Sequence, residues 1–600
     1  MSSTGSKQKS TDKSKRKGVD SRLIQRLYVF LAPYKGYLIL ALLLTLATAY
    51  LGPLRPYLTQ IAVDDYIAVN DTEGLFRIIL LFAAVLVGEF LLLVTSTYLT
   101  RWIGQGALYS LRMTVFNKIQ YLHVQFFDRN PIGRLITRTT SDIEALSDLL
   151  SSGVVNIIGD VFRIAFILFF MFSLSWELSV VSMLTLPILI CATILFKRLV
   201  RVAFLNVRDQ IARLNSFVQE HINGMSIVQI FGQEKREFNR FKRINGDHTD
   251  AHIKTVFYFS IFWPVVEVLS SVAMALVIWY GGAKTLSGGL TFGILLAFIQ
   301  YVRLFFMPIR DLSDKFNTLQ SALASSERIF DVLDTENEIQ DPESPADFET
   351  AKGSVEFRNV WFRYSPNEDY VLKNISFKLE PGQSMAVVGA TGAGKTTIIN
   401  LITRFYDIEQ GEILLDGINI KDIKLDQLRR SFGLVLQENA LFSGSILDNI
   451  TLGNETINRD RVEKVIEMVE ADRFINKLPG GLDYVLHERG ASLSMGQRQL
   501  ICFIRALVYN PAILILDEAT SSVDTETEML VNTALNELLK GRTSFIVAHR
   551  LSTIQHANTI LVMHKGEIRE SGTHKELISI ESGIYRKLYE LQYKDQLLAS

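Results

Sequence analysis

Six long apolar stretches in the first 310 residues constrain the fold of this chain most, because each approaches the roughly 20 residues that cross a bilayer. A backbone in hydrocarbon must satisfy its own hydrogen bonds, so each stretch predicts a transmembrane helix. The six predicted spans are residues 36–62, 76–103, 154–174, 178–196, 256–280 and 292–307. The sixth is the least regular, since Arg303 interrupts it and Pro308 follows it.

An even number of spans returns the chain to the side on which it started. The polar basic tail of residues 1–20 is predicted to be a disordered, solvated segment; the alternative is a signal that retains this side in the cytoplasm, in keeping with the positive-inside rule. We therefore expect a multi-pass protein of the cell membrane, which in a bacterium is the cytoplasmic or inner membrane. Both the N-terminus and the part that follows the last span should be cytoplasmic.

Two polar segments with a helical pattern separate spans two and three and spans four and five, and we expect them to extend into the cytoplasm. Their predicted tips are residues 125–134, where Asn130-Pro131 favours a turn, and residues 215–233. A polar segment with two prolines then precedes a second domain. The predicted divisions are a tail (1–20), a transmembrane domain (21–335), a linker (336–353), a second domain (354–592) and a tail (593–600).

Composition excludes some classes of function. The net charge of −1 offers no bulk attraction for nucleic acid, so no nucleic-acid partner is expected. The two cysteines, Cys191 and Cys502, are too few and too differently placed for a disulfide framework.

A phosphate-binding loop follows the apolar stretch 384–388, which reads as a buried strand. Its pattern GxxxxGK[ST] consists of Gly389, Ala390, Thr391, Gly392, Ala393, Gly394, Lys395 and Thr396. Such a loop turns backbone N–H groups towards phosphates, while the lysine neutralises the terminal phosphates and the Thr396 hydroxyl ligates Mg²⁺. Thr397, next in the chain, belongs to the same predicted binding set. The sequence therefore predicts ATP and Mg²⁺ as cofactors.

A second apolar run, residues 512–516, ends in Asp517-Glu518, as a strand buried on both faces does when it delivers carboxylates to a site. Asp517 is then a predicted Mg²⁺ ligand, and Glu518 is predicted to orient or deprotonate the attacking water. A solvated acidic loop is the structural alternative. His549 follows the strand-like stretch 544–548 and is predicted to sense the γ-phosphate, although alone it would be an ordinary histidine.

These motifs, in this order and with Gln437 and Leu493-Ser494-Met495-Gly496-Gln497 between them, resemble those of an ABC ATPase. The whole chain, from about residue 20 to 595, resembles an ABC exporter half-transporter. The expected fold is an all-α transmembrane domain of six helices followed by an α/β P-loop ATPase domain. The resemblance implies that Tyr364 stacks on adenine and that Gln437 touches both Mg²⁺ and the attacking water. It also implies that Ser494, Gly496 and Gln497 contact the nucleotide of a second chain, and that Asp524 lies in a loop that crosses to that chain.

Met495 departs from the family pattern, which usually has glycine at this position. Its side chain either alters the backbone or crowds the partner's nucleotide, or it is tolerated. In one interpretation the chain is a homodimer with two working sites; in the other it pairs with a different half-transporter and one site is weakened.

Five charged residues fall in or near apolar stretches: Glu89, Asp160, Arg163, Glu267 and Arg303. Charges in a membrane face the interior of the helix bundle. Pairing between helices is one interpretation, and contact with an amphipathic or cationic hydrophobic substrate is the other.

The predicted function is ATP-driven export of a hydrophobic drug-like molecule or a lipid, with ATP binding closing a dimer of ATPase domains and hydrolysis resetting it. The direction of transport rests on the resemblance. Alternatives are a subunit of a peptide exporter and an ATP-gated channel or regulator. The predicted partners are a second half-transporter, membrane lipid and the substrate.

Overall fold

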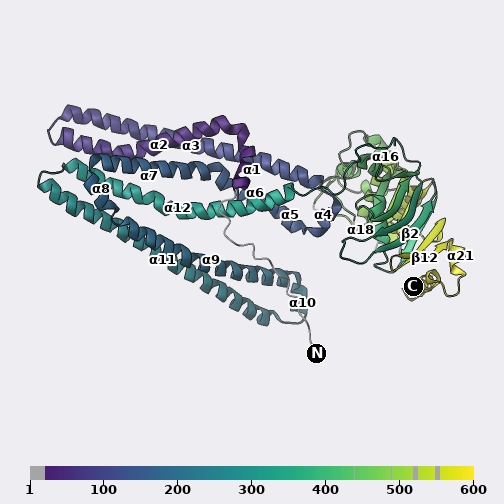
Figure 1. Cartoon of the computed structure of the whole chain (residues 1–600). Coiled ribbons are helices and arrows are strands. Elements are labelled where there is room, and N and C mark those ends of the chain that lie inside the picture. The colour runs from purple at the N-terminus through teal and green to yellow at the C-terminus, as the bar shows by residue number, and fades with distance from the viewer. Residues whose placement is uncertain (1–20, 438, 488–489, 518–524, 548–553, 600) are drawn as a thin grey trace. The chain divides into compact units, whose positions relative to one another are not determined.

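The computed structural model describes residues 21–437, 439–487, 490–517, 525–547 and 554–599 (Figure 1). The chain divides into two compact units. The helical unit contains residues up to 120 and residues 132–335, and the α/β unit contains residues 121–131 and the chain from residue 336 onward. Each unit is described separately.

The helical unit is built from long helices that lie side by side, and α3, α9, α11 and α12 are the longest of them. Its helices are α1 (Ser21–Leu31), α2 (Lys35–Ile61), α3 (Thr72–Gln120), α5 (Ile132–Thr139), α6 (Ser141–Glu144), α7 (Val154–Leu174), α8 (Trp176–Met183), α9 (Leu186–Asn223), α10 (Met225–Ile230), α11 (Glu234–Leu286) and α12 (Phe292–Leu333). Shorter helical turns are η1 (Ala32–Tyr34), η2 (Ala62–Ile67) and η3 (Leu149–Gly153).

Within the described residues, five helical stretches are long and apolar enough to cross a membrane. They are Gln25–Ile67, Thr72–Gln120, Ile132–Leu174, Trp176–Asn223 and Glu234–Leu286. A shorter apolar helix, Phe292–Pro308, coincides with the sixth predicted span. The chain is therefore a multi-pass membrane protein.

Two helices are far longer than a bilayer is thick. At 1.5 Å per residue, the 49 residues of α3 and the 53 residues of α11 extend for roughly 74 and 80 Å, against about 30 Å of hydrocarbon. Most of each helix must therefore lie outside the membrane, as expected for the polar segments between the spans.

The fourth predicted span is not one continuous helix. A turn at Leu184 and Thr185 separates α8 from α9, and Pro187 occupies the first turn of α9. Proline has no N–H to donate, so the helical hydrogen bond from residue 187 to the carbonyl of Met183 is missing at this turn. The sequence analysis missed this break.

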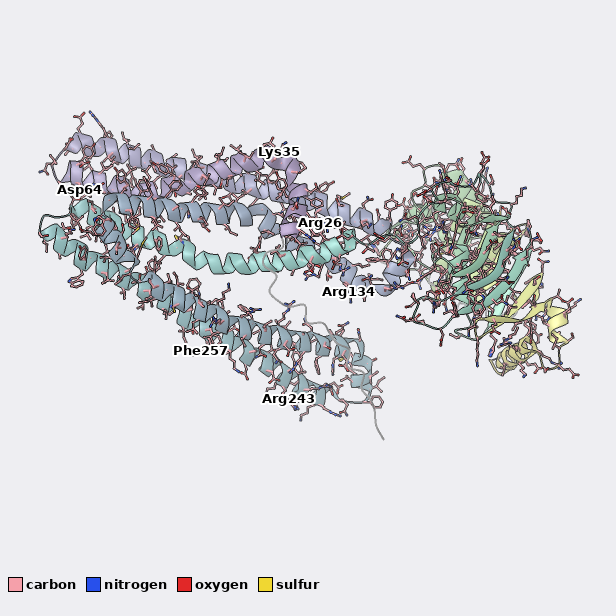
Figure 2. The ribbon with its side chains drawn as sticks, viewed as in Figure 1. Arg26, Lys35, Asp64, Arg134, Arg243 and Phe257 are labelled. Atoms are coloured by element: carbon pink, nitrogen blue, oxygen red, sulfur yellow. The ribbon has the colours of Figure 1, made fainter. Side chains whose placement is uncertain are left out.

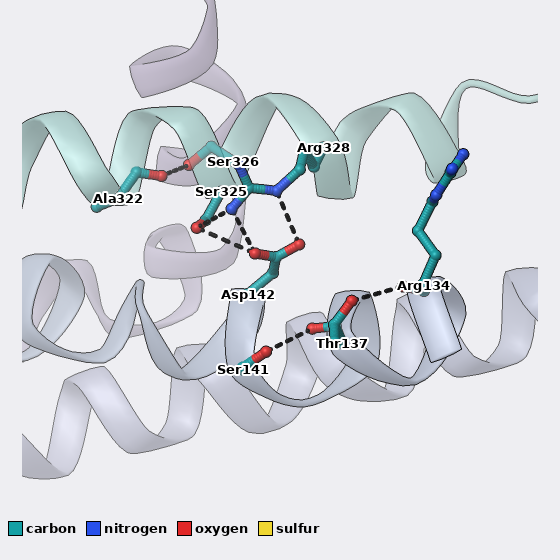
Figure 3. A network of polar contacts seen from close by, with 8 residues as sticks. All are labelled: Arg134, Thr137, Ser141, Asp142, Ala322, Ser325, Ser326 and Arg328. Carbon is teal, nitrogen blue, oxygen red and sulfur yellow. Dashed lines mark hydrogen bonds and ion pairs between the residues drawn. The ribbon is translucent and has the colours of Figure 1, made fainter. Parts of the chain in front are cut away.

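Polar contacts hold distant segments of the helical unit together (Figure 2). Asp64, at the end of the first helix pair, accepts a hydrogen bond of 2.8 Å from the backbone N–H of Gly293 at the start of α12. At the other end of α12, Arg328 forms a two-pronged ion pair with Asp142 of α6, with N···O distances of 2.5 and 3.0 Å (Figure 3). Ser325 contacts both partners, so the buried carboxylate of Asp142 is fully engaged.

The described residues of the α/β unit form three sheets. Their strands are β1 (Val355–Phe362), β2 (Leu372–Leu379), β3 (Ser384–Gly389), β4 (Gln410–Leu415), β5 (Ile418–Asn419), β6 (Phe432–Val435), β7 (Gly444–Ser445), β8 (Val485–Leu486), β9 (Ile513–Asp517), β10 (Thr543–Val547), β11 (Thr559–His564) and β12 (Glu567–Gly572). The six-stranded sheet has the order β12-β11-β3-β10-β9-β6, and all of its neighbours are parallel except β11 and β12. An antiparallel sheet has the order β2-β1-β4-β5, and β7 pairs with β8.

Helices cover these sheets. They are α4 (Val124–Arg129), α13 (Lys395–Ile402), α14 (Leu425–Arg430), α15 (Ile446–Thr451), α16 (Arg459–Met468), α17 (Asp472–Ile475), α18 (Met495–Tyr509), α19 (Thr525–Leu539), α21 (His574–Ile578) and α22 (Ile584–Ala599), with the short turn η4 (Gly481–Asp483). The central strands β9 and β10 are buried along their whole length, as expected for parallel strands with both faces covered. The expected fold class, an all-α membrane unit followed by an α/β unit, is confirmed.

Candidate functional site

Several of the predicted site residues lie at the carboxyl ends of parallel strands, along one edge of the six-stranded sheet. β3 ends at Gly389, where the phosphate-binding loop starts, and β9 ends at Asp517. Gln437 follows the end of β6, in the same sheet. Open parallel sheets bind ligands beyond these ends, so strand order alone brings together residues that are 128 positions apart.

The phosphate-binding loop needs its glycines. Gly389, Gly392 and Gly394 have φ values of 155°, 81° and 102°, which side-chain-bearing residues rarely adopt. A Cβ atom at Gly389 would also lie 2.3 Å from the carbonyl oxygen of Met563. Gly394 is the N-cap of α13, so the loop ends where the positive end of a helix begins.

Lys395 starts α13 and is buried, with 8% of its surface exposed. Its Nζ donates hydrogen bonds to the carbonyl oxygens of Gly389 (2.8 Å) and Ala390 (3.3 Å). The Lys395 side chain therefore folds back onto the phosphate-binding loop, and its positive charge lies beside the N-terminus of α13. Ala393, also in the loop, is buried and packs in the core of the unit.

A pocket of about 490 Å³ lies over this loop. It is lined by Tyr364, Val371, Thr391, Gly392, Gly394, Lys395, Thr396, Thr397, Gln437, Asp517 and Val547. Thr396, Gln437 and Asp517 bring hydroxyl, amide and carboxylate oxygens to one cavity, a donor set that suits Mg²⁺. Val371 and Val547 were not predicted; each is an apolar residue next to or within a strand, and nothing in the sequence distinguishes it from the core.

Tyr364 borders the pocket and has defined neighbours. Its hydroxyl lies 3.0 Å from the Thr397 hydroxyl, and its ring meets the rings of Phe362 and Tyr406 edge-on, at centroid distances of 4.9 and 5.0 Å. The ring is therefore held at the mouth of the pocket by one hydrogen bond and two aromatic contacts.

Helix α4, from the first predicted cytoplasmic tip, contacts this aromatic group within the α/β unit. The Tyr406 hydroxyl donates a hydrogen bond to the carboxylate of Asp128, and Arg129 donates to the backbone carbonyl of Tyr364 (3.2 Å). Tyr406 is buried; desolvation, and then the Asp128 carboxylate, raise its pKa above the usual range, so the phenol remains a donor. The sequence analysis predicted this tip at residues 125–134, which include Asp128, but did not pair Asp128 with Tyr406.

The segment around Met495 lies apart from the pocket. Ser494 caps α18: its hydroxyl accepts from the N–H of Gln497 (3.3 Å), and the Gln497 side chain accepts from the N–H of Ser494 (3.0 Å). Met495 is the first residue of α18 and Gly496 the second, so Met495 has an ordinary helical backbone and a partly exposed side chain.

Three predicted residues, Glu518, Asp524 and His549, lie outside the described residues. The strands that precede two of them, β9 and β10, end at the pocket with Asp517 and Val547.

Comparison with protein families gives two matches in this chain. Residues 38–309 match the ABC transporter transmembrane region, and residues 372–521 match the ABC transporter family of ATP-binding domains. Relatives align over most of their length. An uncharacterized ABC transporter ATP-binding protein of Bacillus subtilis is 37% identical over 95% of this chain and 94% of its own.

Two further relatives have named functions. An ATP-dependent lipid A-core flippase of Desulfotalea psychrophila is 34% identical over 96% of this chain and 100% of its own. A fatty acid ABC transporter ATP-binding/permease protein of Mycobacterium tuberculosis is 37% identical over 87% of this chain and 82% of its own. With both family regions in one polypeptide and a phosphate-binding pocket in the α/β unit, the chain belongs to the ABC transporter family and is an ATPase coupled to membrane transport.

Proposed function

We propose that this chain exports an amphipathic lipid or another hydrophobic molecule across the cell membrane, powered by ATP hydrolysis in the α/β unit. The observation that carries the proposal is the fusion of a multi-pass helical unit to a unit with a complete P-loop pocket. The flippase and the fatty acid transporter, both similar over most of the chain, favour a lipid-like substrate. The N-terminus and the α/β unit are cytoplasmic in this proposal.

Each pocket residue has a proposed role. Tyr364 stacks on the adenine, and the backbone N–H groups of residues 389–394 together with Lys395 bind the phosphates. Thr396, Asp517 and Gln437 supply oxygen ligands for Mg²⁺, which when bound neutralises charge on the phosphates. Glu518 deprotonates or orients the attacking water, and His549 contacts the γ-phosphate.

A second chain completes the site. Ser494, Gly496 and Gln497 do not line the pocket of their own chain, although α18 presents a capped N-terminus that is suited to an anion. In the proposed arrangement they face the nucleotide held by a second half-transporter, and Asp524 lies in the loop that crosses to it. ATP bound between two such units closes them, and hydrolysis lets them separate.

Helix α4 is proposed to link the pocket to the membrane helices. It lies between α3 and α5 in the chain, yet Asp128 and Arg129 contact Tyr406 and Tyr364 of the α/β unit. A shift of Tyr364 when adenine binds would therefore move α4, and with it the ends of α3 and α5 that adjoin α4 in the chain.

Reconstitution tests the proposal. The full chain is placed in liposomes with its α/β unit outside, and the movement of a fluorescent phospholipid between leaflets is followed with and without ATP and Mg²⁺. Movement that needs ATP and stops in Glu518→Gln supports an exporter. Movement down a gradient without hydrolysis would indicate a channel, and ATP hydrolysis that moves only peptides would indicate a peptide exporter.

A further inference from the structure

Arg303 places a positive charge near the middle of the membrane. Helix α12 starts at Phe292, and Arg303 is eleven residues further on. At 1.5 Å per residue, this corresponds to about 17 Å along the helix, close to half of the roughly 30 Å hydrocarbon thickness.

This arginine is exposed and has no hydrogen-bond or ion-pair partner among the described residues. Several other charges of the membrane helices are engaged, with Arg163 as an exception that is discussed below. Arg55 of α2 lies 3.3 Å from the carboxylate of Glu89 on α3, and Asp160 and Glu267 each have an interaction of their own. Arg303 is therefore a cation whose charge no described residue of this chain compensates.

The side of α12 that carries Arg303 is distinct from its packed side. Phe298, Tyr301, Val302 and Phe305 are buried in the core of the helical unit. The opposite strip follows helical spacing and contains no fully buried residue, although Ile299 at its border packs in part against the core: Phe292, Leu296, Ile299, Gln300, Arg303 and Met307, here called the Arg303 face. Gln300, one turn before Arg303, also lacks a polar partner among the described residues.

A charge at this depth cannot face lipid without a large energetic penalty. Intramembrane charges accordingly face a bundle interior or a water-filled cavity. Since Arg303 is exposed within its own chain, the enclosing wall must come from outside the chain. That requirement places the Arg303 face towards the cavity between this chain and the second half-transporter.

Arg163 of α7 is the nearest comparison, because it is also an arginine near mid-membrane and also lacks a partner among the described residues. It is half-buried, however, and shares its side of α7 with Ile167 and Phe170, which pack inside the unit. This chain therefore covers the side of α7 that carries Arg163 in part and leaves Arg303 exposed.

We infer that Arg303, assisted by Gln300, binds the anionic head group of the transported amphipath; this rests on the proposed function. A guanidinium has five N–H donors and no acceptor, and it binds carboxylate or phosphate through two parallel hydrogen bonds. The Gln300 amide adds a donor one turn away, while Phe292, Leu296, Ile299 and Met307 offer apolar contact to a hydrocarbon chain. The substrate class is an anionic lipid-like molecule, with a carboxylate or a phosphate monoester head.

The test uses four amphipaths that share one oleyl chain and differ only in the head: oleate, oleyl phosphate, oleyl alcohol and oleylamine. Their binding to the full transporter in nanodiscs is measured by native mass spectrometry, which does not depend on ATP hydrolysis. If the chain alone is inactive, it is measured together with its partner half-transporter. We expect at least tenfold tighter binding of one or both anions than of the alcohol, and the tighter anion identifies the head group.

Three variants locate the preference. Arg303→Gln should remove the preference for anions, Arg303→Lys should retain part of it, and Arg303→Glu should transfer it to oleylamine. Arg163→Gln removes an arginine of similar depth from the packed side of α7 and is the matched control; it should leave the preference unchanged.

Equal binding of all four amphipaths by the wild-type protein would overturn the inference, and this result needs no variant to fold. An anion preference that survives in Arg303→Gln would also overturn it, as would pairing of Arg303 with an acidic residue of the second chain. Failure of the proposed function looks different: none of the four molecules would move across the membrane in an ATP-dependent way, whatever they bind.

Discussion

At the scale of single residues, Lys395 is the cation most directly placed for nucleotide binding, because it is buried beside the phosphate-binding loop. Lys395→Ala should weaken ATP binding by about 10- to 100-fold, since hydrogen bonds to charged groups contribute roughly 1.5–3 kcal/mol. Titration with a fluorescent ATP analogue measures the change. Lys464→Ala, on the exposed side of α16, is the control and should bind ATP as the wild type does. Unchanged affinity in Lys395→Ala would remove this residue from the phosphate site.

Glu518 is expected to act on the attacking water and not on ATP affinity. Glu518→Gln keeps the size of the side chain but cannot accept a proton, so hydrolysis should fall by at least about 100-fold, within the range of general-base catalysis, while ATP still binds. Phosphate release and nucleotide binding are measured on the same preparation, with Glu467→Gln of α16 as the control. Near-normal turnover in Glu518→Gln would show that another group serves as the base.

At the scale of elements, the contact between α4 and the aromatic group should matter for coupling more than for stability. Tyr406→Phe removes only the hydroxyl that bonds to Asp128 and keeps the ring against Tyr364. We expect basal ATP hydrolysis to persist while its stimulation by transported substrate falls. A double-mutant cycle with Asp128→Asn should give a coupling energy of about 0.5–1.5 kcal/mol between the two side chains. A coupling energy of zero between Tyr406 and Asp128, together with unchanged stimulation of ATP hydrolysis by substrate, would show that this contact does not link α4 to the pocket.

The junction of α9 and α11 contains a pH-dependent pair. His221 contacts two acceptors, the carbonyl of Phe217 through Nδ1 and the Glu237 carboxylate through Nε2, both at 2.8 Å, so both ring nitrogens must carry hydrogen when both bonds form. The hydrogen bond to Glu237 raises the pKa of His221, and the same bond lowers the pKa of Glu237.

The sign of the pH effect follows from these two shifts. The contribution of His221 to the stability of this junction is fully present below about pH 6.5 and is lost as the pH rises through its raised pKa. The contribution of Glu237 to that stability is lost as the pH falls below about 4.5. Amide hydrogen exchange of α10 should therefore quicken, once corrected for the intrinsic pH dependence, between neutral and mildly alkaline pH. His221→Gln should abolish this change, and an identical pH profile in that variant would contradict the prediction.

At the scale of the whole molecule, the site is expected to be shared between chains. A Lys395→Ala chain and a Ser494→Arg chain should each be inactive in ATP hydrolysis. Mixed before reconstitution, they should regain activity, because one of the two sites in a mixed dimer combines an intact P-loop with an intact Ser494. No recovery, with an active wild-type homodimer as the reference, would place both residues in the same site of one chain. A wild-type chain that is inactive until a different half-transporter is added would instead support the heterodimer and give Met495 a role.

The class of each unit can be read from local sequence signals. Apolar runs of bilayer length leave a chain few alternatives to membrane helices, and the glycines at 389, 392 and 394 occupy backbone conformations that few other residues adopt, so both signals are local. The break between α8 and α9 has a local contribution from Pro187, but proline alone does not predict it, because Pro53, Pro56, Pro264 and Pro308 lie inside continuous helices. Local signals of this kind can be read without knowing what packs against them.

Only the tertiary structure decided which distant residues meet. Asp128 and Tyr406 are 278 positions apart and each is unremarkable in its own segment; their contact follows from the packing of α4 on the α/β unit. Likewise, the sequence shows both Arg163 and Arg303 as charges in apolar stretches. In the folded chain Arg163 is half-buried beside Ile167 and Phe170 of α7, whereas Arg303 of α12 is exposed. The hydrophobic effect has no preferred direction, so it does not specify which apolar surface a helix face packs against. That choice depends on the whole packed core and not on the residues next to the helix in the sequence.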